Sequence, residues 1–321
     1  MLYRRLGTTG LQLSALGLGS WVTFGEQIGV KTATECLEAA YESGVNFFDN
    51  AESYAKGESE RVMGKAFADL GWPRHTFVVS TKVFWGLHDE VNMRNTLNRK
   101  YLLQAVEGCL ERLGLEFVDI LYCHRADPAT PLEETVWAMS DIVSSGKALY
   151  WGTSEWPATD IRGAWEIAER LHLRKPVAEQ PQYNLLSRTR VELEYARLCQ
   201  ECGIGLTTFS PLAGGLLTGK YTEGIPPGTR ATLPAYDWLA ARLTDPGRND
   251  KAREVKDIAD GIGCDMAQLA IAWCLRNPAV SSVIMGASAA AQVRSNVAAL
   301  DILPLISGEV ADRLDAISPP G

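Results

Sequence analysis

The amino-acid sequence predicts an α/β fold, a (β/α)8 TIM barrel that occupies residues 1–321 as a single domain. Eight short apolar runs, rich in β-branched and aromatic residues, alternate with longer segments of helical periodicity. Most of these runs recur at roughly 30 residues, the length of one strand–helix unit. An open doubly wound sheet usually carries a G-x-G-x-x-G turn after its first strand. Here the first run continues as Gly17-Leu18-Gly19-Ser20-Trp21, with no third glycine in register. The number of units therefore favours the closed barrel.

The predicted strands are nearly all apolar, which is typical of a sheet that is filled on one face and covered by helices on the other. They are Ala15–Leu18, Asn46–Asp49, Phe77–Lys82, Val118–Cys123, Ala148–Ser154, Pro176–Gln180, Gly205–Phe209 and Ser282–Met285. The helical pattern predicts helices over Ala33–Ser43, Ser59–Leu70, Lys100–Leu113, Leu132–Ser145, Asp160–Leu171, Arg190–Cys202, Lys251–Ile262, Met266–Arg276 and Ala290–Leu300.

Two segments depart from the repeat. Tyr3–Leu6 and Leu11–Leu13 flank Gly-Thr-Thr-Gly, which is a hairpin signal, and we expect this N-terminal β-hairpin to plug the bottom of the barrel. Residues Leu216–Asp250 separate the seventh strand from its helix and are rich in Gly, Pro and Thr. Loops of that length are usually lids or binding loops, so we expect a long binding loop here.

Composition excludes several classes of protein. The 321 residues carry 31 Lys+Arg and 39 Asp+Glu, a formal net charge of −8. This acidic balance, without a long basic run, argues against nucleic acid or anionic membrane as the main partner. No apolar run approaches the ~20 residues that span a bilayer, and no secretory signal follows the N-terminus.

Cysteine and histidine usage gives two further expectations. The seven cysteines contain no paired C-x-x-C units, which favours reduced thiols and a cytoplasmic location. The four histidines show no metal-ligand spacing, so no metal site is predicted.

Polar side chains gather where the predicted strands end, and in a barrel those ends meet at one site. Asp49 ends the second strand and Tyr54 follows in the loop, while Lys82 and His124 lie at the ends of the third and fourth strands. A phenol with a pKa of about 10 is a poor acid near neutrality, and a nearby ammonium lowers that pKa. We therefore expect Tyr54 to be a proton donor assisted by an Asp49–Lys82 pair.

His124 would hold a carbonyl oxygen near the phenol. With an ordinary pKa of about 6.5, its imidazole would titrate near neutrality. Any one of the four residues alone is more often a cap, an ion pair or a structural residue. Their joint placement predicts general acid chemistry.

Long ordered motifs run from Tyr3-Arg4-Arg5-Leu6-Gly7 to about Leu303. They include Gly44-Val45-Asn46-Phe47-Phe48-Asp49-Asn50-Ala51-Glu52-Ser53-Tyr54, Leu113–Ile120, Tyr150–Ser154, Gln182–Leu186, Phe209–Leu212, Gly219-Lys220-Tyr221 and Gly286-Ala287-Ser288. Through them the sequence resembles the aldo-keto reductases. It is most similar to the branch that contains the potassium-channel beta subunits and their bacterial and plant relatives.

The resemblance implies NADPH-dependent reduction of aldehydes or ketones to alcohols. In that family hydride passes from the nicotinamide to the carbonyl carbon while a tyrosine protonates the oxygen. Asp49, Tyr54, Lys82 and His124 match the four catalytic positions. Channel beta subunits carry Asn where this sequence has His124, and histidine is the usual choice in the more active reductases.

His124 therefore favours an enzyme over the alternative, a redox-sensing, NADP-binding accessory subunit of a potassium channel. The sequence also begins at the hairpin, without a long N-terminal extension that could plug a pore. The physiological carbonyl and the oligomeric state stay open. The channel branch forms fourfold assemblies, so the resemblance implies a homotetramer or octamer.

The resemblance also implies a set of residues that contact NADP(H). They are Ser20, Trp21, Gln27, Asp49, Ser154, Gln180, Phe209, Ser210, Pro211, Leu212, Ala213, Gly214, Lys220, Arg230, Gly286, Ser288, Gln292, Ser295 and Asn296. Ser154 and Gln180 would bind the nicotinamide amide, and Phe209 would stack on its ring. Ser210, Leu212, Gly214 and Lys220, with Arg230 beyond them, would clamp the diphosphate. Ser288, Gln292 and Asn296 would hold the adenosine end.

Three positions depart from the family pattern. Glu155 stands where relatives often have Asn or Arg, and an ionised carboxylate cannot donate a hydrogen bond to the nicotinamide amide. The Lys and Arg that much of the family places near Ser288 and Gln292 are absent. Arg230 would therefore supply most of the charge for the 2′-phosphate, and NADP is preferred over NAD.

Aromatic residues in the loops after the strands predict an apolar carbonyl pocket. They are Trp21, Phe24, Tyr54, Phe84, Trp85 and Trp156. The alternative is that half of them pack between loops.

Overall fold

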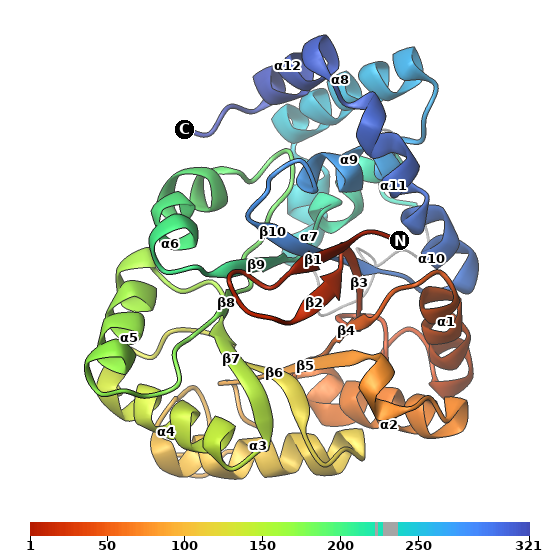
Figure 1. Ribbon diagram of the computed structural model, residues 1–321. Helices are drawn as coiled ribbons and strands as arrows, with labels where there is room; N and C mark the ends of the chain where they lie inside the picture. The colour runs from red at the N-terminus through yellow and green to blue at the C-terminus, as the bar shows by residue number, and fades with distance from the viewer. Residues whose placement is uncertain (222–223, 227–236) are drawn as a thin grey trace.

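The computed structural model describes residues 1–221, 224–226 and 237–321. Within these residues, parallel strands form a closed barrel in the order β10-β3-β4-β5-β6-β7-β8-β9, with helices around it (Figure 1). The TIM barrel prediction is therefore confirmed. The strands are β3 (Leu16–Gly19), β4 (Phe47–Asp49), β5 (Val78–Val83), β6 (Val118–Cys123), β7 (Ala148–Thr153), β8 (Ala178–Glu179), β9 (Gly205–Thr208) and β10 (Val280–Gly286).

The helices follow the strands along the chain. They are α1 (Val30–Glu42), α2 (Glu58–Leu70), α3 (Arg99–Leu113), α4 (Leu132–Ser144), α5 (Ala158–Arg170), α6 (Ala196–Glu201), α7 (Asp237–Leu243), α8 (Pro246–Ile262), α9 (Met266–Cys274), α10 (Ala290–Val297), α11 (Ala299–Ile302) and α12 (Gly308–Ile317). Side-chain caps fix some of the starts: Asn98 accepts from the Tyr101 amide before α3, and Asp265 accepts from Ala267 and Gln268 before α9. No described helix is long and apolar enough to cross a membrane.

The structure corrects the predicted helices in three places. The segment predicted as one helix over Arg190–Cys202 is a π-helical turn, η3 (Arg190–Glu194), followed by α6. The helix predicted over Ala290–Leu300 is divided into α10 and α11. The C-terminal α12, which the sequence analysis did not predict, buries Ala311, Leu314 and Ile317.

The long segment predicted as a loop over Leu216–Asp250 is partly helical. It contains α7 and the first turn of α8, which begins at Pro246 rather than Lys251. The Asp245 side chain caps α8 by accepting from the Arg248 amide at 2.8 Å. A 3-10 turn, η4 (Ala213–Thr218), leads into the segment from β9.

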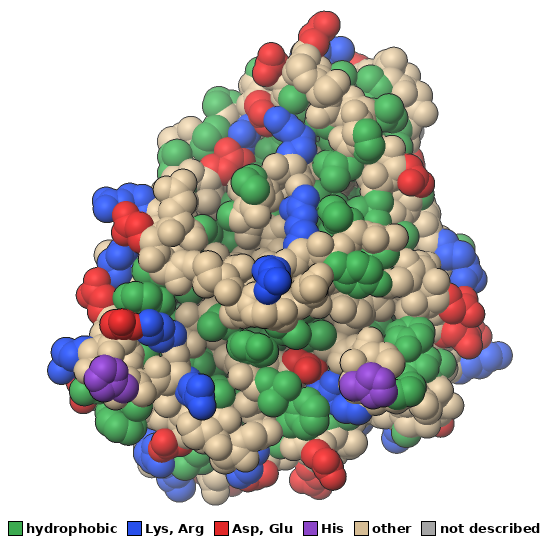
Figure 2. Space-filling model, viewed as in Figure 1, with side chains coloured by type: hydrophobic (Ala, Val, Ile, Leu, Met, Phe, Trp, Pro, Cys, Tyr) green, Lys and Arg blue, Asp and Glu red, His purple; other side chains and the backbone are tan. Residues whose placement is uncertain are grey.

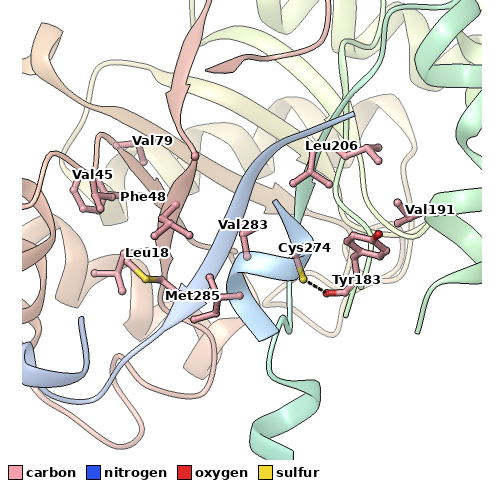
Figure 3. Close-up of a cluster of buried hydrophobic side chains, with 14 of the residues drawn as sticks. Leu18, Val45, Phe48, Val79, Tyr183, Val191, Leu206, Cys274, Val283 and Met285 are labelled. Atoms are coloured by element: carbon pink, nitrogen blue, oxygen red, sulfur yellow. Dashed lines mark hydrogen bonds between the residues drawn. The ribbon is translucent and has the colours of Figure 1, made fainter. Parts of the chain in front are cut away.

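Side-chain alternation along the strands divides the core into two layers. The interior of the barrel holds Phe47, Val78, Ile120, Tyr122, Ala178 and Ile284. Residues of the opposite parity, such as Phe48 and Val79, pack with Leu18, Val283 and Met285 in the layer between the barrel and its helices (Figure 3). The strands are therefore buried on both faces, which explains their continuous apolar runs.

The N-terminal hairpin closes the bottom of the barrel, as predicted. Strands β1 (Tyr3–Arg5) and β2 (Gln12–Ser14) pair antiparallel, and in Figure 1 they lie across the middle of the barrel. Leu6 and Leu13 are fully buried in the interior layer. The Arg4 guanidinium donates to the backbone oxygens of Leu275 and Val280 at 2.7 and 2.8 Å, which fastens the hairpin beside β10.

Charged side chains do not gather on the face shown in Figure 2. There the Lys/Arg and Asp/Glu side chains are interspersed and lie mostly toward the rim, with apolar side chains between them.

A substitution at Gly7 should destabilise the fold. Gly7 has φ +54°, and a Cβ atom there would lie 2.0 Å from the Gly203 oxygen and 2.6 Å from the Gly205 nitrogen. We expect Gly7→Ala to lower the free energy of unfolding by about 2 kcal/mol or more, measured by denaturant titration. Gly10→Ala is the matched control, because a Cβ at Gly10 meets no atom within 4 Å. Equal stability of the two variants would contradict this account of the plug.

Candidate active site

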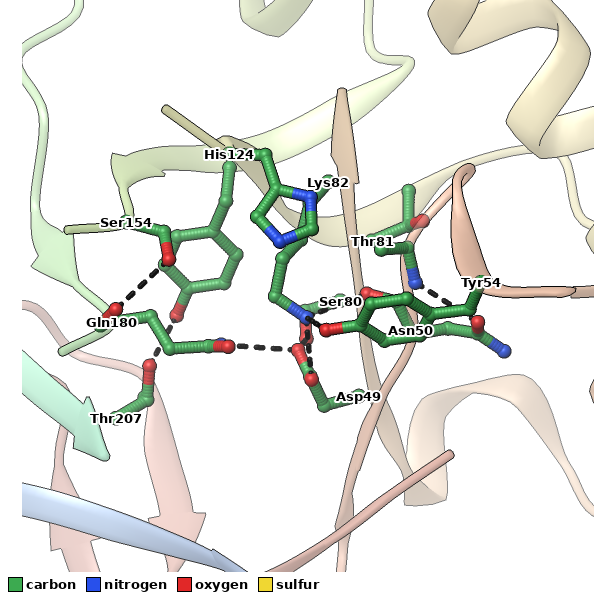
Figure 4. Close-up of polar contacts among 12 residues, drawn as sticks. Asp49, Asn50, Tyr54, Ser80, Thr81, Lys82, His124, Ser154, Gln180 and Thr207 are labelled. Carbon is green, nitrogen blue, oxygen red and sulfur yellow. Dashed lines mark hydrogen bonds and ion pairs between the residues drawn. The ribbon is translucent and has the colours of Figure 1, made fainter. Parts of the chain in front are cut away.

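The carboxyl ends of β4, β5 and β6 bring four polar side chains together. Asp49 ends β4, Lys82 is the penultimate residue of β5, and His124 directly follows β6. Tyr54 begins the short 3-10 turn η1 (Tyr54–Gly57) after β4. Figure 4 shows the four side chains converging at this end of the barrel. The structure thus brings together all four residues that the sequence analysis selected.

The Lys82 ammonium lies at the centre of the group and is 1% exposed. It donates to Asp49 Oδ2 at 2.6 Å, to the Asn50 oxygen at 2.8 Å and to Tyr54 Oη at 3.2 Å. An ammonium has three N–H donors and no acceptor, so the phenol oxygen of Tyr54 must be the acceptor. The phenolic proton is therefore left free to be donated elsewhere.

The Asp49 carboxylate connects this group to the neighbouring strand β5 and to the residue that follows β8 across the barrel. Its Oδ2 faces Lys82, while Oδ1 accepts from Ser80 Oγ at 2.6 Å and from Gln180 Nε2 at 3.1 Å. Burial opposes the charge on Lys82, but the attraction of Asp49, with a smaller contribution from Tyr54, raises the pKa of Lys82 above its ordinary value. The amine therefore stays charged across the neutral range.

The loop that carries Tyr54 is held by a buried glutamate. Glu52 accepts hydrogen bonds from the amides of Phe84 and Gly86 at 2.9 and 3.0 Å and from the Tyr101 hydroxyl. These bonds fasten the loop after β4 to the loop after β5. Ala55 and Lys56 then adopt left-handed φ values of 48° and 54°, a strained turn of the kind that is retained at functional sites.

The acidity of Tyr54 differs from the sequence-based expectation. Burial raises the pKa of the Tyr54 phenol above its ordinary value, and this outweighs the opposing effect of Lys82. The expected direction of the Lys82 effect is correct, but the expected net lowering of the Tyr54 pKa is wrong. The phenol therefore stays protonated at neutral pH, as a proton donor must.

His124 is nearly buried between two aromatic rings. Its ring lies 5.9 Å from Tyr54 and 6.3 Å from Trp85, centroid to centroid, with both pairs edge to face. Burial, followed by the charges of Lys82 and Arg125, lowers the pKa of His124 well below its ordinary value. The expectation that this imidazole titrates near neutrality is therefore wrong. The imidazole is neutral at working pH and has one N–H to donate.

A cavity of about 1010 Å³ extends from these residues toward α10. Many of the predicted cofactor residues line it, together with Asp49, Tyr54 and His124. These lining residues are Trp21, Gln27, Ser154, Gln180, Phe209, Ser210, Pro211, Leu212, Gly214, Lys220, Gly286, Ser288, Gln292 and Asn296. Lys82 lies behind Tyr54 and Asp49 rather than on the cavity wall.

Four predicted cofactor residues are not placed on the cavity wall. Ser20 is fully buried behind the wall, and Ala213 is 6% exposed within η4. Ser295 lies on the exposed side of α10, where its backbone oxygen accepts from Gln268. Arg230 lies outside the described residues.

The far end of the cavity is built by the turn between β10 and α10. Gln292 Oε1 accepts from the Ser288 amide and hydroxyl at 2.9 and 3.2 Å. Asn296 lies one helical turn after Gln292, and its Nδ2 donates to the Gly286 oxygen at 3.5 Å. Next to Lys220, Tyr221 also lines the cavity, and its buried hydroxyl has no hydrogen-bond partner among the described residues.

Glu155, which stands where relatives often have Asn or Arg, faces away from the cavity. Its backbone has φ 57°, its Oε2 pairs with Arg190 Nη1 at 2.9 Å, and its Oε1 accepts from the Gln182 amide at 2.6 Å. Behind it, Glu179 accepts from the Glu155 amide at 2.6 Å and from the Thr153 hydroxyl. Burial raises the pKa of Glu179 to about 8. Glu155 therefore anchors the turn that carries Ser154 instead of contacting a ligand.

Only three of the six aromatic residues predicted for the substrate pocket line the cavity. They are Trp21, Tyr54 and Trp85. Phe24, Phe84 and Trp156 do not: their exposed fractions are 1%, 8% and 1%, and they pack against the core under the loops.

Sequence reasoning assigned no role to Arg125 or Tyr221, although both line the cavity. Tyr221 lies within the Gly219-Lys220-Tyr221 motif that the sequence analysis noted, and Arg125 directly follows His124. Among the described residues, no group of three His, Cys, Asp or Glu side chains is placed to hold a metal ion.

Comparison with known proteins identifies close relatives. The sequence profile of the Aldo/keto reductase family matches residues 15–319. The chain is 50% identical over 318 residues to a rice (Oryza sativa subsp. japonica) protein called "Probable voltage-gated potassium channel subunit beta". It is 48% identical over 318 residues to an Arabidopsis thaliana protein of the same name. Each match covers 99% of this chain and 96% of the relative.

Proposed function

The chain belongs to the aldo/keto reductase family, and from this premise we propose that it is an NADPH-dependent reductase of aldehydes or ketones. The observation that carries the proposal is the hydrogen bond from Lys82 Nζ to Tyr54 Oη, which leaves the phenolic proton of Tyr54 free at the cavity. A protonated phenol beside a buried ammonium is suited to protonate an oxygen that is gaining negative charge.

The described residues fit a bound NADP(H). The cavity is large, its wall carries the cation Lys220 at a turn rich in glycine, and beside Gly215 in that turn the buried Tyr221 hydroxyl has no hydrogen-bond partner among the described residues. Ser154 and Gln180 would hold the nicotinamide amide, Phe209 the ring face, and Ser288, Gln292 and Asn296 the adenosine end. When bound, the cofactor would supply hydride to the carbonyl carbon.

The chain's own residues would handle the carbonyl oxygen. His124, as a neutral imidazole, donates a hydrogen bond that aligns the oxygen. Tyr54 donates its proton to that oxygen, and the charge of Lys82 stabilises the phenolate that remains. Asp49 keeps Lys82 charged and oriented. Trp21 and Trp85 provide apolar walls that exclude water.

The direct test is cofactor oxidation by purified protein with a panel of aromatic aldehydes. We expect consumption of NADPH that depends on the aldehyde, with equimolar alcohol product, and slower turnover with NADH. A protein that binds NADPH but produces no alcohol from any member of the panel would overturn the proposal.

A second candidate function rests on the names of the relatives. The rice and Arabidopsis proteins are called probable channel beta subunits, so an NADP-binding accessory subunit is the alternative for this chain. Rapid multiple turnover of a good aldehyde, which requires rapid release of the oxidised cofactor, would favour the enzyme. Slow turnover limited by cofactor release would favour the accessory subunit.

Location and assembly are part of the same proposal. All seven cysteines are free thiols, in keeping with a cytoplasmic location. A homotetramer or octamer is proposed from the family alone.

His124→Asn should separate the two candidates. The variant keeps a donor but changes its reach, so we expect single-turnover reduction to slow by roughly 10²-fold, by analogy with loss of one oxyanion donor. Because burial lowers the pKa of His124 well below its ordinary value, the imidazole is neutral at neutral pH and above. The wild-type and variant pH profiles should therefore have the same shape from neutrality upward. An unchanged rate of hydride transfer would make His124 a packing residue.

A further inference from the structure

The catalytic end of the cavity holds a cation that the proposed mechanism does not use. Among the described residues that line the cavity, the Lys and Arg residues are Lys220 and Arg125. Lys220 follows η4, on the segment assigned to the diphosphate. Arg125 directly follows His124, beside the groups that act on the carbonyl.

The contacts of Arg125 leave part of its guanidinium available. Nη1 donates to the His124 backbone oxygen and lies 3.5 Å from Ser154 Oγ. The guanidinium carbon stands 5.9 Å from the ring centroid of Trp85. Within the described residues no carboxylate pairs with Arg125, and its Nε and Nη2 donate to no protein group. A planar fork with open donors is well suited to a carboxylate or phosphate.

Arg125 lies next to the position where a carbonyl would react. The rings of Tyr54 and Trp85 flank His124, and the guanidinium of Arg125 lies over the ring of Trp85. Tyr54, His124, Trp85 and Arg125 therefore line one continuous side of the cavity. A small molecule whose carbonyl oxygen meets Tyr54 and His124 has Arg125 within reach of its other end.

We propose that Arg125 binds an anionic group of the substrate, so that the preferred substrates are small aldehydes that also carry a carboxylate or a phosphate. This inference rests on the proposed reductase function and specifies its substrate class. The Trp85 ring beside the guanidinium covers part of it and so reduces the screening of that attraction by water. The chain as a whole carries a formal net charge of −8, so the positive charge of Arg125 in the cavity is opposite in sign to that of the protein.

The test compares an anionic and a neutral substrate of the same shape. 4-Carboxybenzaldehyde and 4-nitrobenzaldehyde are both planar at the para position, but only the first is charged. For each variant the ratio of their kcat/KM values is measured, so that intrinsic reactivity cancels between variants. We expect this ratio to fall about tenfold to a hundredfold in Arg125→Met, mainly through KM of the anionic substrate, because a charge-assisted hydrogen bond is lost. Arg125→Lys should recover part of the ratio.

Arg197→Met is the matched control. It removes the same charge from α6, where Arg197 is 81% exposed and pairs with Glu201, so it should leave the ratio at the wild-type value. A second substrate pair, 4-formylphenyl phosphate against 4-methoxybenzaldehyde, shows whether phosphate or carboxylate gives the larger effect. A loss in either pair supports the subsite and identifies its anion.

Two outcomes would overturn the subsite while leaving the reductase function intact. One is an unchanged ratio in Arg125→Met for both substrate pairs. The other is an equal loss for charged and neutral substrates together with weaker NADPH binding in a fluorescence titration, which would assign Arg125 to support of Ser154. Failure of the wild-type protein to reduce any aldehyde would instead overturn the proposed function itself.

Discussion

Replacing Tyr54 with phenylalanine should lower kcat for aldehyde reduction by about 10²–10⁴-fold, the usual contribution of a positioned general acid. The change removes only the hydroxyl that accepts from Lys82 and faces the cavity. Affinity for NADPH should stay close to that of the wild-type protein, because the rest of the side chain is kept. Steady-state and single-turnover rates with one good aldehyde, together with a fluorescence titration of NADPH, measure both quantities.

Tyr41→Phe is the matched control for that experiment. The Tyr41 hydroxyl bonds to Thr76 Oγ1 at 2.9 Å and does not line the cavity, so its loss should leave kcat near the wild-type value. A near-normal kcat in Tyr54→Phe would remove Tyr54 from the role of proton donor.

Replacing Lys82 with methionine should affect both activity and stability. The substitution leaves the buried Asp49 carboxylate without its cation, and breaking a buried ion pair from one side costs about 3–5 kcal/mol of unfolding free energy. The pKa of Tyr54 should rise further, because Lys82 opposes the effect of burial more strongly than Arg125, the other cation that lowers this pKa. We expect kcat to fall by at least about 10²-fold across the neutral range.

A double variant separates the two effects of Lys82. Adding Asp49→Asn to Lys82→Met removes the uncompensated charge while keeping an oxygen that can accept from Ser80 and Gln180. Denaturant titration should show much of the stability restored, whereas activity should stay low. Full activity in the double variant would contradict the role of Lys82 in supporting Tyr54.

The strand pattern and the grouping of the four polar side chains could be predicted because both follow from short-range features of the chain. Apolar runs locate the strands, and parallel strands in a barrel necessarily bring their carboxyl ends together. Asp49, Lys82 and His124 could therefore be grouped before any contact was known. The helix α7 was missed because the Gly- and Pro-rich sequence around it hides the start of a helix.

Other features depend on the direction in which a side chain points, and no pattern of residues along the sequence indicates that direction. Glu155 faces Arg190 only because its backbone adopts φ 57°, and no residue pattern indicates that turn. Phe24, Phe84 and Trp156 lie in loops, where alternation does not separate cavity walls from core. The pKa of Tyr54 depends on burial against a nearby charge, and the sequence shows the charge but not the burial.

The two oxygens of Asp49 have a consequence for anyone who wishes to redesign this protein. One oxygen holds Lys82, and the other accepts from Gln180, a residue assigned to the nicotinamide amide. A substitution at Gln180 that is meant to change the cofactor also removes a hydrogen bond from the carboxylate that orients the ammonium beside Tyr54. Cofactor binding and proton delivery are thus not independent design variables in this barrel, and a library that varies Gln180 should keep Ser80 unchanged so that Oδ1 of Asp49 retains its other donor.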